Sequence, residues 1–262
     1  MSLAPRSVSD ALRSWALLLD CPVGYLEVQR VDWHERDSSD APFVMTFVRG
    51  TVGLVSLPNA DSRDFDLQSD ELRSLLDMTR AETHVGETVQ LRDARLEVEN
   101  EPAALAVADH QTLTVEPRVA ASLVYDPRPA VMDMLRHEVS PQDWQDGGGA
   151  HESPHRVGAM SGGVLVAVAS VTRPVGHMAR IRVVVAPTHR RRGFGRLVLR
   201  ALARHVIDQG MIPFCRLAGN DIAARALASA VGFVAFAHSL TLRVTSIGSY
   251  GGAPTQSSPA RG

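Results

Sequence analysis

A short basic segment, rich in glycine, offers the clearest chemistry in this sequence. Residues 188–196 read THRRRGFGR and lie between a predicted strand and a predicted helix. A helix N-terminus presents up to about four unpaired N–H groups and about half a positive charge, so it binds anions readily. Gly193 and Gly195 let a phosphate approach the backbone closely. The four arginines of the segment add charge-assisted donors that suit a pyrophosphate.

Other functions of such a segment can be weighed from its composition. It lacks the Gly-Lys-Ser/Thr ending of a P-loop, and it lacks the third glycine and the downstream acidic residue of a dinucleotide-binding fingerprint. Nucleotide hydrolysis and hydride transfer are therefore disfavoured. An arginine run can also be a solvated surface patch or a nucleic-acid contact. With 27 basic and 29 acidic residues the chain has a formal charge of −2, so no global field draws it to nucleic acid or a membrane.

The segment sits within a regular series of predicted elements that must position it. Apolar alternation and helical spacing predict strands at 157–160, 164–171 and 181–185, a helix over 197–206, a strand at 212–217, a helix over 221–230 and a strand at 240–244. The first two strands flank Ser161-Gly162-Gly163 and form a hairpin. Two shorter helices, near 131–135 and from Pro141, are predicted ahead of them.

The first 126 residues predict a second, less regular part. Its predicted elements are helices at 9–19 and 71–79, strands at 25–31, 43–48 and 51–57, and short strands at 89–91, 96–98, 104–107 and 113–115. Two prolines within residues 125–129 break regular structure, so we place a domain boundary after residue 126. We expect a divergent α+β domain over 1–126, a second domain over 127–245, and a disordered tail over 246–262 that is rich in Gly, Ser and Pro.

Two motifs carry a resemblance to a known family. Residues 190–195 (RRRGFG), preceded by the strand IRVVV, resemble the acetyl-CoA signature of the GNAT superfamily of N-acetyltransferases. Residues 220–227 (NDIAARAL), followed by Gly232-Phe233, are similar to the next motif of that superfamily. The resemblance covers about residues 127–244. It implies an α/β (α+β) domain with a mixed, mostly antiparallel sheet flanked by helices, behind a divergent N-terminal segment.

The resemblance also implies a cofactor site for acetyl-CoA. In the family, the strand corresponding to 181–185 splays from its neighbour, and the pantetheine arm pairs with backbone groups there. The implied cofactor-binding residues are Val183, Val184, Val185, Arg190, Arg191, Arg192, Gly193, Phe194, Gly195, Arg196 and Asn220. Asn220 has two interpretations at this stage, a pantetheine contact or a plain helix N-cap.

The catalytic groups are much less clear. The resemblance implies an oxyanion donor in the backbone N–H of Val183. The family's thiolate-protonating tyrosine corresponds to Ala228, and arginines occupy the places of the carboxylates common on the splayed strand. His177, Glu152 and His155 are the nearest titratable candidates, although each is also compatible with a surface-loop position. Cys215 is expected to be a small core residue and not an acyl carrier.

The composition narrows the setting of the reaction. The two cysteines have no metal-ligand spacing, so neither a disulfide framework nor a metal site is predicted. No apolar run approaches a membrane span, and we expect a cytoplasmic protein with no nucleic-acid or membrane partner. The primary hypothesis is transfer of acetyl from acetyl-CoA to an amine of a small molecule or protein. The alternative is a non-catalytic acyl-CoA-binding sensor or regulatory module. If the strand at 240–244 lies at the edge of the sheet, it can pair with a second copy of the chain, so a homodimer stays an alternative.

Overall fold

One continuous mixed sheet runs through the whole computed structural model, which describes residues 2–28, 31–36, 43–58, 69–81, 83–91, 94–115, 117 and 119–247. The strand order is β1-β3-β2-β11-β5-β10-β9-β8-β7-β6, and β4 pairs with β5 outside this series. The strands are β1 (Val31–Arg36), β2 (Phe43–Arg49), β3 (Val52–Pro58), β4 (Thr88–Leu91), β5 (Ala94–Val107), β6 (Ser122–Tyr125), β7 (Arg156–Ser161), β8 (Val164–Val175), β9 (Met178–Val185), β10 (Ile212–Ala218) and β11 (Val234–Ile247). The helices are α1 (Pro5–Leu19), α2 (Gly24–Glu27), α3 (Ser69–Met78), α4 (Pro129–Glu138), α5 (Pro141–Asp146), α6 (Phe194–Asp208) and α7 (Ile222–Val231), with a 3-10 turn at Pro187–His189.

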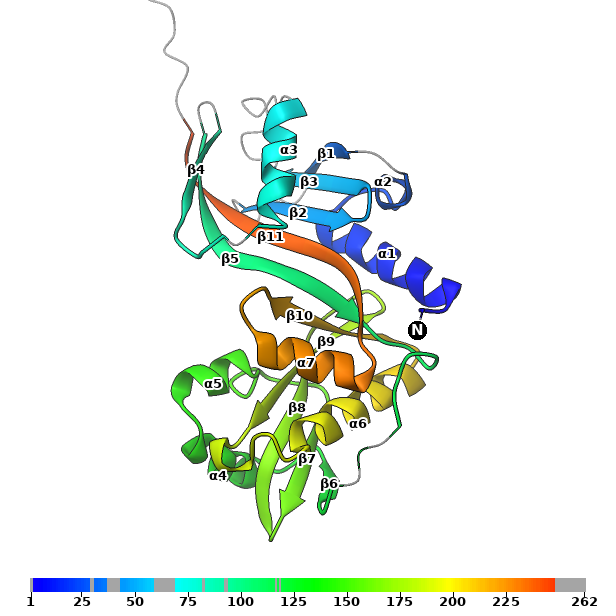
Figure 1. Ribbon diagram of the computed structural model, residues 1–262, viewed down its shortest axis with the longest axis vertical. Helices are drawn as coiled ribbons and strands as arrows, with labels where there is room; N and C mark the ends of the chain where they lie inside the picture. The colour runs from blue at the N-terminus through cyan, green and yellow to red at the C-terminus, as the bar shows by residue number, and fades with distance from the viewer. Residues whose placement is uncertain are drawn as a thin grey trace, which may run out of the picture.

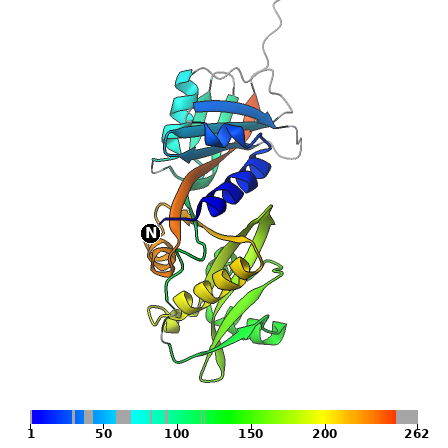
Figure 2. The ribbon, with the colours of Figure 1, turned by 90° about the vertical axis from the view of Figure 1, so that its right-hand side faces the viewer.

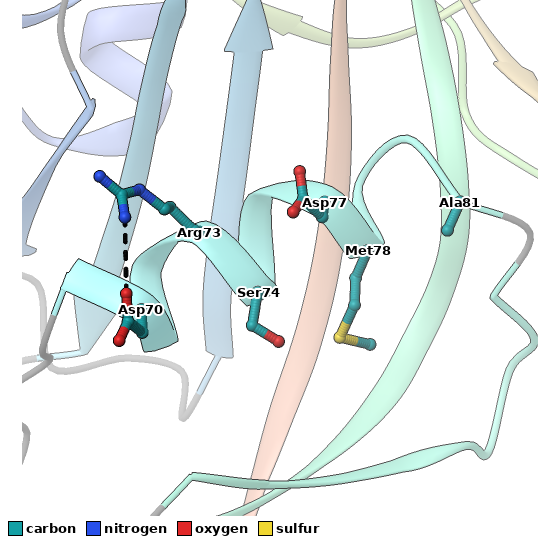
Figure 3. Close-up of a pocket in the computed structure, with 6 residues that line it drawn as sticks. All are labelled: Asp70, Arg73, Ser74, Asp77, Met78 and Ala81. Carbon is teal, nitrogen blue, oxygen red and sulfur yellow. Dashed lines mark hydrogen bonds and ion pairs between the residues drawn. The ribbon is translucent and has the colours of Figure 1, made fainter.

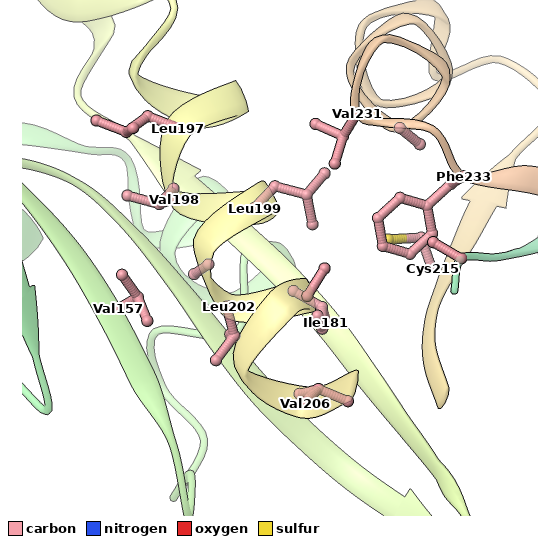
Figure 4. Packing of buried hydrophobic residues seen from close by; sticks show 14 of the residues in the cluster. Val157, Ile181, Leu197, Val198, Leu199, Leu202, Val206, Cys215, Val231 and Phe233 are labelled. Atoms are coloured by element: carbon pink, nitrogen blue, oxygen red, sulfur yellow. The ribbon is translucent and has the colours of Figure 1, made fainter. Parts of the chain in front are cut away.

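Helix α6 packs its apolar side against one face of the C-terminal strands. Its buried residues, among them Leu202 and Val206, meet Val157 of β7 and Ile181 of β9 in one core cluster (Figure 4). Helix α7 closes the same cluster through Val231. Because alternate strand residues face this side, the odd-numbered residues of β9 point toward α6.

The opposite face is covered by three other helices. Trp144 of α5 and Leu135 of α4 pack with Val184 of β9 in a second cluster. Trp15 of α1 lies 6.1 Å from Phe214 of β10, measured between ring centroids. Even-numbered residues of β9 therefore face a layer built from α1, α4 and α5.

Two long strands join the N-terminal and C-terminal parts. Strand β5 pairs antiparallel with both β10 and β11, so an N-terminal strand completes the sheet of the C-terminal part. Figure 1 shows β5 and β11 running from the region of β1–β4 to the region of α6 and α7, and Figure 2 shows the same two strands from the side. The proposed division at residue 126 therefore separates two sequence segments that share one sheet.

Several predicted elements differ in the structure. Residues 24–27, predicted within a strand at 25–31, form α2, and the strand begins only at Val31. The short strands at 96–98 and 104–107 are one strand, β5, bent by irregular register near Asn100. Residues 113–115 form no strand, and β6 was not predicted because prolines follow it directly.

The C-terminal strand corrects another expectation. Residues 240–244 pair with β2 on one side and with β5 on the other, so they lie inside the sheet and are not an exposed edge. The homodimer alternative rested on an exposed strand edge at 240–244, and the structure has no such edge at this position. Ser246 and Ile247, predicted within the tail, belong to β11. The rest of the predicted disordered tail, 248–262, lies outside the described residues.

Two further observations concern the chain as a whole. Among the helices of the described residues, none combines the length and the apolar character needed to cross a membrane. Both cysteines have free thiols. Cys215 is buried in the cluster under α6, as predicted for a core residue, and this burial raises the pKa of its thiol to about 12.

Candidate functional site

A V-shaped opening between β9 and β10 lies at the centre of the C-terminal part. The two parallel strands pair only at three positions, from Met178 opposite Ile212 to Arg180 opposite Phe214. Beyond this point β9 continues to Val185 beside β8, while β10 continues beside β5. Neighbouring strands therefore diverge over the predicted segment 181–185.

The backbone of β9 directs hydrogen-bonding groups into this opening. The N–H of Ala186 donates to the carbonyl of Val166 at 2.9 Å, which makes that pair a hydrogen-bonded pair of the β8–β9 ladder. In an antiparallel ladder such pairs alternate with pairs whose N–H and C=O groups point outward. Val183 and Val185 are thus turned away from β8, as the resemblance implied for a pantetheine contact. Val184 has its backbone turned toward β8 and its side chain packed against α4 and α5.

The basic loop, residues 188–196, leads from β9 into the N-terminus of α6. Gly193 is the N-cap with φ of 89°, a left-handed conformation that favours glycine, and no described side chain caps the helix. The first helical bond runs from the N–H of Leu197 to the carbonyl of Gly193 at 3.0 Å. The N–H groups of residues 194–196 therefore have no partner inside the helix.

The arginines of the basic loop occupy different environments. Arg190 forms an ion pair of 3.1 Å with Asp143 of α5, and its Nε donates to the carbonyl of Val185 at 3.3 Å. Hydrogen bonds from Ser140 and from Arg190 lower the pKa of Asp143. The guanidinium of Arg192 lies over the ring of Phe194, 5.5 Å from its centroid.

One arginine of the loop has unused hydrogen-bonding capacity. The Nε of Arg196 is buried and lacks a hydrogen-bond partner within the described part of the chain. A buried donor without a partner costs about 1–3 kcal/mol. A bound pyrophosphate would supply an acceptor at this turn, so the residues present fit an anionic ligand.

Gly195 holds the first turn of α6 close to the wall of the opening. A Cβ at Gly195 would stand 3.2 Å from Cγ2 of Val185 and 3.6 Å from Cδ2 of Leu227. The helix N-terminus is therefore packed directly beside the outward-facing end of β9. The uncapped amides of α6 therefore lie close to the outward-facing backbone groups of Val183 and Val185, of which the Val185 carbonyl accepts from Arg190.

Asn220 does not cap α7. Asp221 is the N-cap, and its carboxylate accepts from the N–H of Ala224 at 2.8 Å. Asn220 is exposed and lines a cavity of about 350 Å³ between the N-terminal part and α7, together with Glu101 and His238. The N-cap interpretation is thus wrong, and the ligand interpretation stays a prediction.

The three titratable candidates lie at different places. His177 stands in the turn before β9, where its N–H donates to Oγ of Ser14 at 3.0 Å. It is six residues before Val183, about 20 Å along a strand. The ring of His155 lies 5.0 Å from that of His205, near the C-terminus of α6. This helix is about 22 Å long, and the basic loop is at its other end.

Glu152 and the position of the family tyrosine complete this set. Glu152 is exposed in the connection between α5 and β7. Ala228 is 2% exposed, and its carbonyl accepts from the N–H groups of Gly232 and Phe233 at 3.1 and 3.0 Å. Ser229, the neighbour of Ala228, is exposed on α7.

Sequence analysis missed a group of arginines on the other side of the opening. Arg180 and Arg182 of β9 and Arg216 of β10, here called the arginine face, are half-buried on the side opposite α6. Burial lowers the pKa of Arg216, and the charge of Arg182 lowers it further, whereas Glu101 raises it. Glu101 of β5 thus supplies a carboxylate near β10. The parallel register of β9 and β10 was needed to find this group, and the sequence pattern does not reveal it.

A second hollow lies far from these residues. It has a volume of about 480 Å³ and follows one side of α3, lined by Asp70, Arg73, Ser74, Asp77, Met78 and Ala81 (Figure 3). Among the lining residues that Figure 3 shows, Arg73 forms an ion pair of 3.5 Å with Asp70. The hollow adds nothing to the opening between β9 and β10.

Comparison with known proteins agrees with this geometry. Residues 156–242 match the family model described as FR47-like protein. No curated protein sequence matches the chain. This family model is GNAT-related, and the matched residues lie in the C-terminal half of the chain, from β7 through most of β11.

Solved structures with a similar fold include three bacterial proteins. A GNAT-family protein from Novosphingobium aromaticivorans is 18% identical, with a TM-score of 0.42 over 64% of this chain and 79% of its own. A GCN5-related N-acetyltransferase from Kribbella flavida is 17% identical, with a TM-score of 0.43 over 57% and 60%. A GNAT-family acetyltransferase from Colwellia psychrerythraea is 19% identical, with a TM-score of 0.43 over 57% and 56%. The aligned region spans less than two thirds of the last two proteins.

Proposed function

We propose that this protein is an N-acetyltransferase that moves an acetyl group from acetyl-CoA to a primary amine. The observation that carries the proposal is the uncapped N-terminus of α6 beside the outward backbone groups of Val183 and Val185. The amides of residues 194–196 and the arginines of the basic loop would hold the pyrophosphate, and Asn220 would contact the pantetheine. The two free thiols suit a reducing compartment, and the cytoplasm is part of the proposal.

The chain's own residues have limited roles in the transfer. Bound acetyl-CoA supplies a thioester: the amine nitrogen forms a bond to its acetyl carbon, the C–S bond breaks, and the amine proton ends on the CoA thiol. The N–H of Val183 would donate to the oxygen on which negative charge develops. An amine with pKa near ~10.4 must first lose a proton. Glu101 of β5, whose charge acts on Arg216 of β10, is the proposed acceptor of this proton through water.

A second candidate function is supported by one specific observation. Ala228 fills the position of the family's proton-donating tyrosine, and its buried methyl group cannot protonate a thiolate. A non-catalytic acyl-CoA-binding sensor or regulatory module would keep the basic loop and lose this group. In the catalytic proposal, water protonates the departing sulfur.

One assay separates the two candidates. Purified protein is mixed with acetyl-CoA and a panel of small amines and amine-bearing peptides, and release of the CoA thiol is followed with a thiol reagent. The proposed function predicts release above the buffer rate for at least one amine. Tight binding of acetyl-CoA in calorimetry with no release for any acceptor would instead support the binding module.

A further inference from the structure

The arginine face stands where the opening between β9 and β10 begins. Arg180 is paired with Phe214, the last paired position of the two strands. Two residues further along, β9 carries Arg182 and β10 carries Arg216. Since side chains two residues apart share a face, all three guanidinium groups project to the same side of the sheet, on both walls of the opening.

Charges and hydrogen bonds connect the arginines of this face with their neighbours. The charge of Arg182 lowers the pKa of Arg216, so the two groups interact electrostatically. Nη1 of Arg182 donates to the carbonyls of Gln145 and Asp146, at 3.2 and 3.3 Å. Nη2 of Arg216 donates to the carbonyl of Glu101. Carbonyl oxygens satisfy donors without cancelling charge, and Arg216 is influenced both by the charge of Arg182 and by the opposite charge of Glu101.

Two buried hydroxyls beside the arginines also lack acceptors. Ser170 lies opposite Arg182 and Thr172 lies opposite Arg180 in the β8–β9 ladder, so each shares a face with its partner. They are 0% and 2% exposed, and neither hydroxyl has a hydrogen-bond partner within the described residues. Each can donate one hydrogen bond. This face of the sheet therefore holds buried hydroxyls whose hydrogen-bonding capacity a ligand could use.

The two faces of the opening carry different groups that could bind a ligand. The N-terminus of α6 lies on the side of the odd-numbered residues of β9, and the arginine face lies on the other side, which Arg190 of the basic loop reaches through its ion pair with Asp143 of α5. Arg182 directly precedes Val183, whose backbone points into the opening. A molecule held by Arg182 and Arg216 would therefore lie beside the opening, on the face of the sheet opposite α6.

We infer that the acceptor is a small amine bearing an anionic group, a carboxylate or a phosphate, which Arg182 and Arg216 bind and Arg180 attracts. This inference rests on the proposed acetyl transfer. Guanidinium groups bind carboxylates and phosphates with paired hydrogen bonds. The same binding orients the amine toward the opening, because amine and anion are joined by a short linker.

Matched pairs of amines test the inference. Each pair differs only in charge: amino acids against their carboxamides, and phosphoethanolamine against ethanolamine. Acetylation is followed by thiol release, and kcat/KM of the anionic member is expected to exceed that of its neutral partner by at least about 10-fold. The two kinds of pair distinguish a carboxylate from a phosphate. A thermal upshift in the presence of CoA gives a second readout that needs no turnover.

Variants of the arginine face provide the control. Arg216→Gln should lower kcat/KM for the preferred anionic amine by about 10-fold or more, with no change for its neutral partner. Arg216→Lys should restore part of the loss by returning the charge. Affinity for acetyl-CoA, measured by calorimetry in both variants, shows whether the fold is intact.

The outcomes separate the inference from the function on which it rests. Neutral amines acetylated as well as their anionic partners would overturn it. So would an intact acetyl-CoA site with neither transfer to nor stabilisation by any anionic amine of the panel. Failure to bind acetyl-CoA at all would reject the proposed function itself.

Discussion

The basic loop follows the C-terminal end of β9, whereas the arginine face lies on the strands β9 and β10 themselves, and both are rich in arginine. The loop exposes Arg191 and Arg192 around a helix N-terminus, whereas Arg180, Arg182 and Arg216 are half-buried on a strand surface. In the loop, the backbone N–H groups at the helix N-terminus are the main hydrogen-bond donors, and the arginine side chains add positive charge. On the strands the side chains alone form the site. The same residue type is thus proposed to hold a diphosphate in the loop and to select a small anion on the strands.

The largest expected effect concerns Gly195. Gly195→Glu places a carboxylate at the turn assigned to the pyrophosphate, so affinity for acetyl-CoA should fall at least about 100-fold, or about 2.7 kcal/mol. Calorimetry measures this affinity. Gly195→Gln is the matched control, because it brings the same bulk toward Val185 without charge. Equal losses in the two variants would mean that bulk, not charge, blocks the site.

An intermediate effect is expected at Arg191. This residue has φ of 62°, a conformation that strains residues with a side chain. Arg191→Gly should leave the melting temperature unchanged or slightly raised and lower acetyl-CoA affinity about 3- to 10-fold, or about 1 kcal/mol. Arg191→Asn, which also tolerates this φ, should show the same loss. Full affinity in both variants would remove Arg191 from the cofactor site.

A smaller effect is expected for the ion pair of Asp143 with Arg190. Both side chains are nearly half exposed, at 46% and 47%. The ion pair and the hydrogen bond from Ser140 together should therefore contribute at most about 1 kcal/mol to stability. The pKa of Asp143 is lowered, so its contribution is present above the unfolded pKa of about 3.9 and is lost as pH falls through the folded pKa.

Thermal melts of Asp143→Asn test this pH dependence of stability. The variant should melt slightly lower than the parent at pH 7, and the two should converge as pH falls through the lowered folded-state pKa, where the parent's carboxyl becomes protonated. A difference that persists or grows in acid would contradict the assigned direction. Arg204→Gln, which breaks the exposed pair with Asp208 at the other end of α6, is a control for general loss of an exposed ion pair.

The smallest effect is predicted for the arginine face on cofactor affinity. Arg182 and Arg216 lie on the side of the sheet opposite the N-terminus of α6, so Arg216→Gln should change acetyl-CoA affinity by less than about twofold. Calorimetry in the preparation used for acceptor assays checks this. A loss comparable to that of Gly195→Glu would show that both groups serve one ligand and would break the comparison.

The contrast between the two regions also explains what the sequence could predict. The basic loop is contiguous, and its meaning depends on local order: strand, glycines, helix. The arginine face joins β9 to β10 across a pairing that ends at Phe214, and no local pattern marks where two strands part. Glu101 was missed for the same reason, because it reaches the site from a strand of the N-terminal part.

Other differences have identifiable causes. Strand β5 was divided into two because Glu99 and Glu101 interrupt its apolar alternation where its pairing with β11 is irregular. Residues 24–27 contain Tyr25 and Leu26, which favour a strand, yet Leu26 is buried within a single helical turn. Asp221 displaced Asn220 as the cap of α7, a shift of one residue that composition does not resolve.

The most direct test of the central claim is a crystal structure with CoA bound. It should place the pyrophosphate within hydrogen-bond distance of the backbone N–H groups of residues 194–196, and the pantetheine beside Val183 and Val185. CoA bound elsewhere, or a helix N-terminus occupied by the protein's own side chains at saturating CoA, would contradict the account.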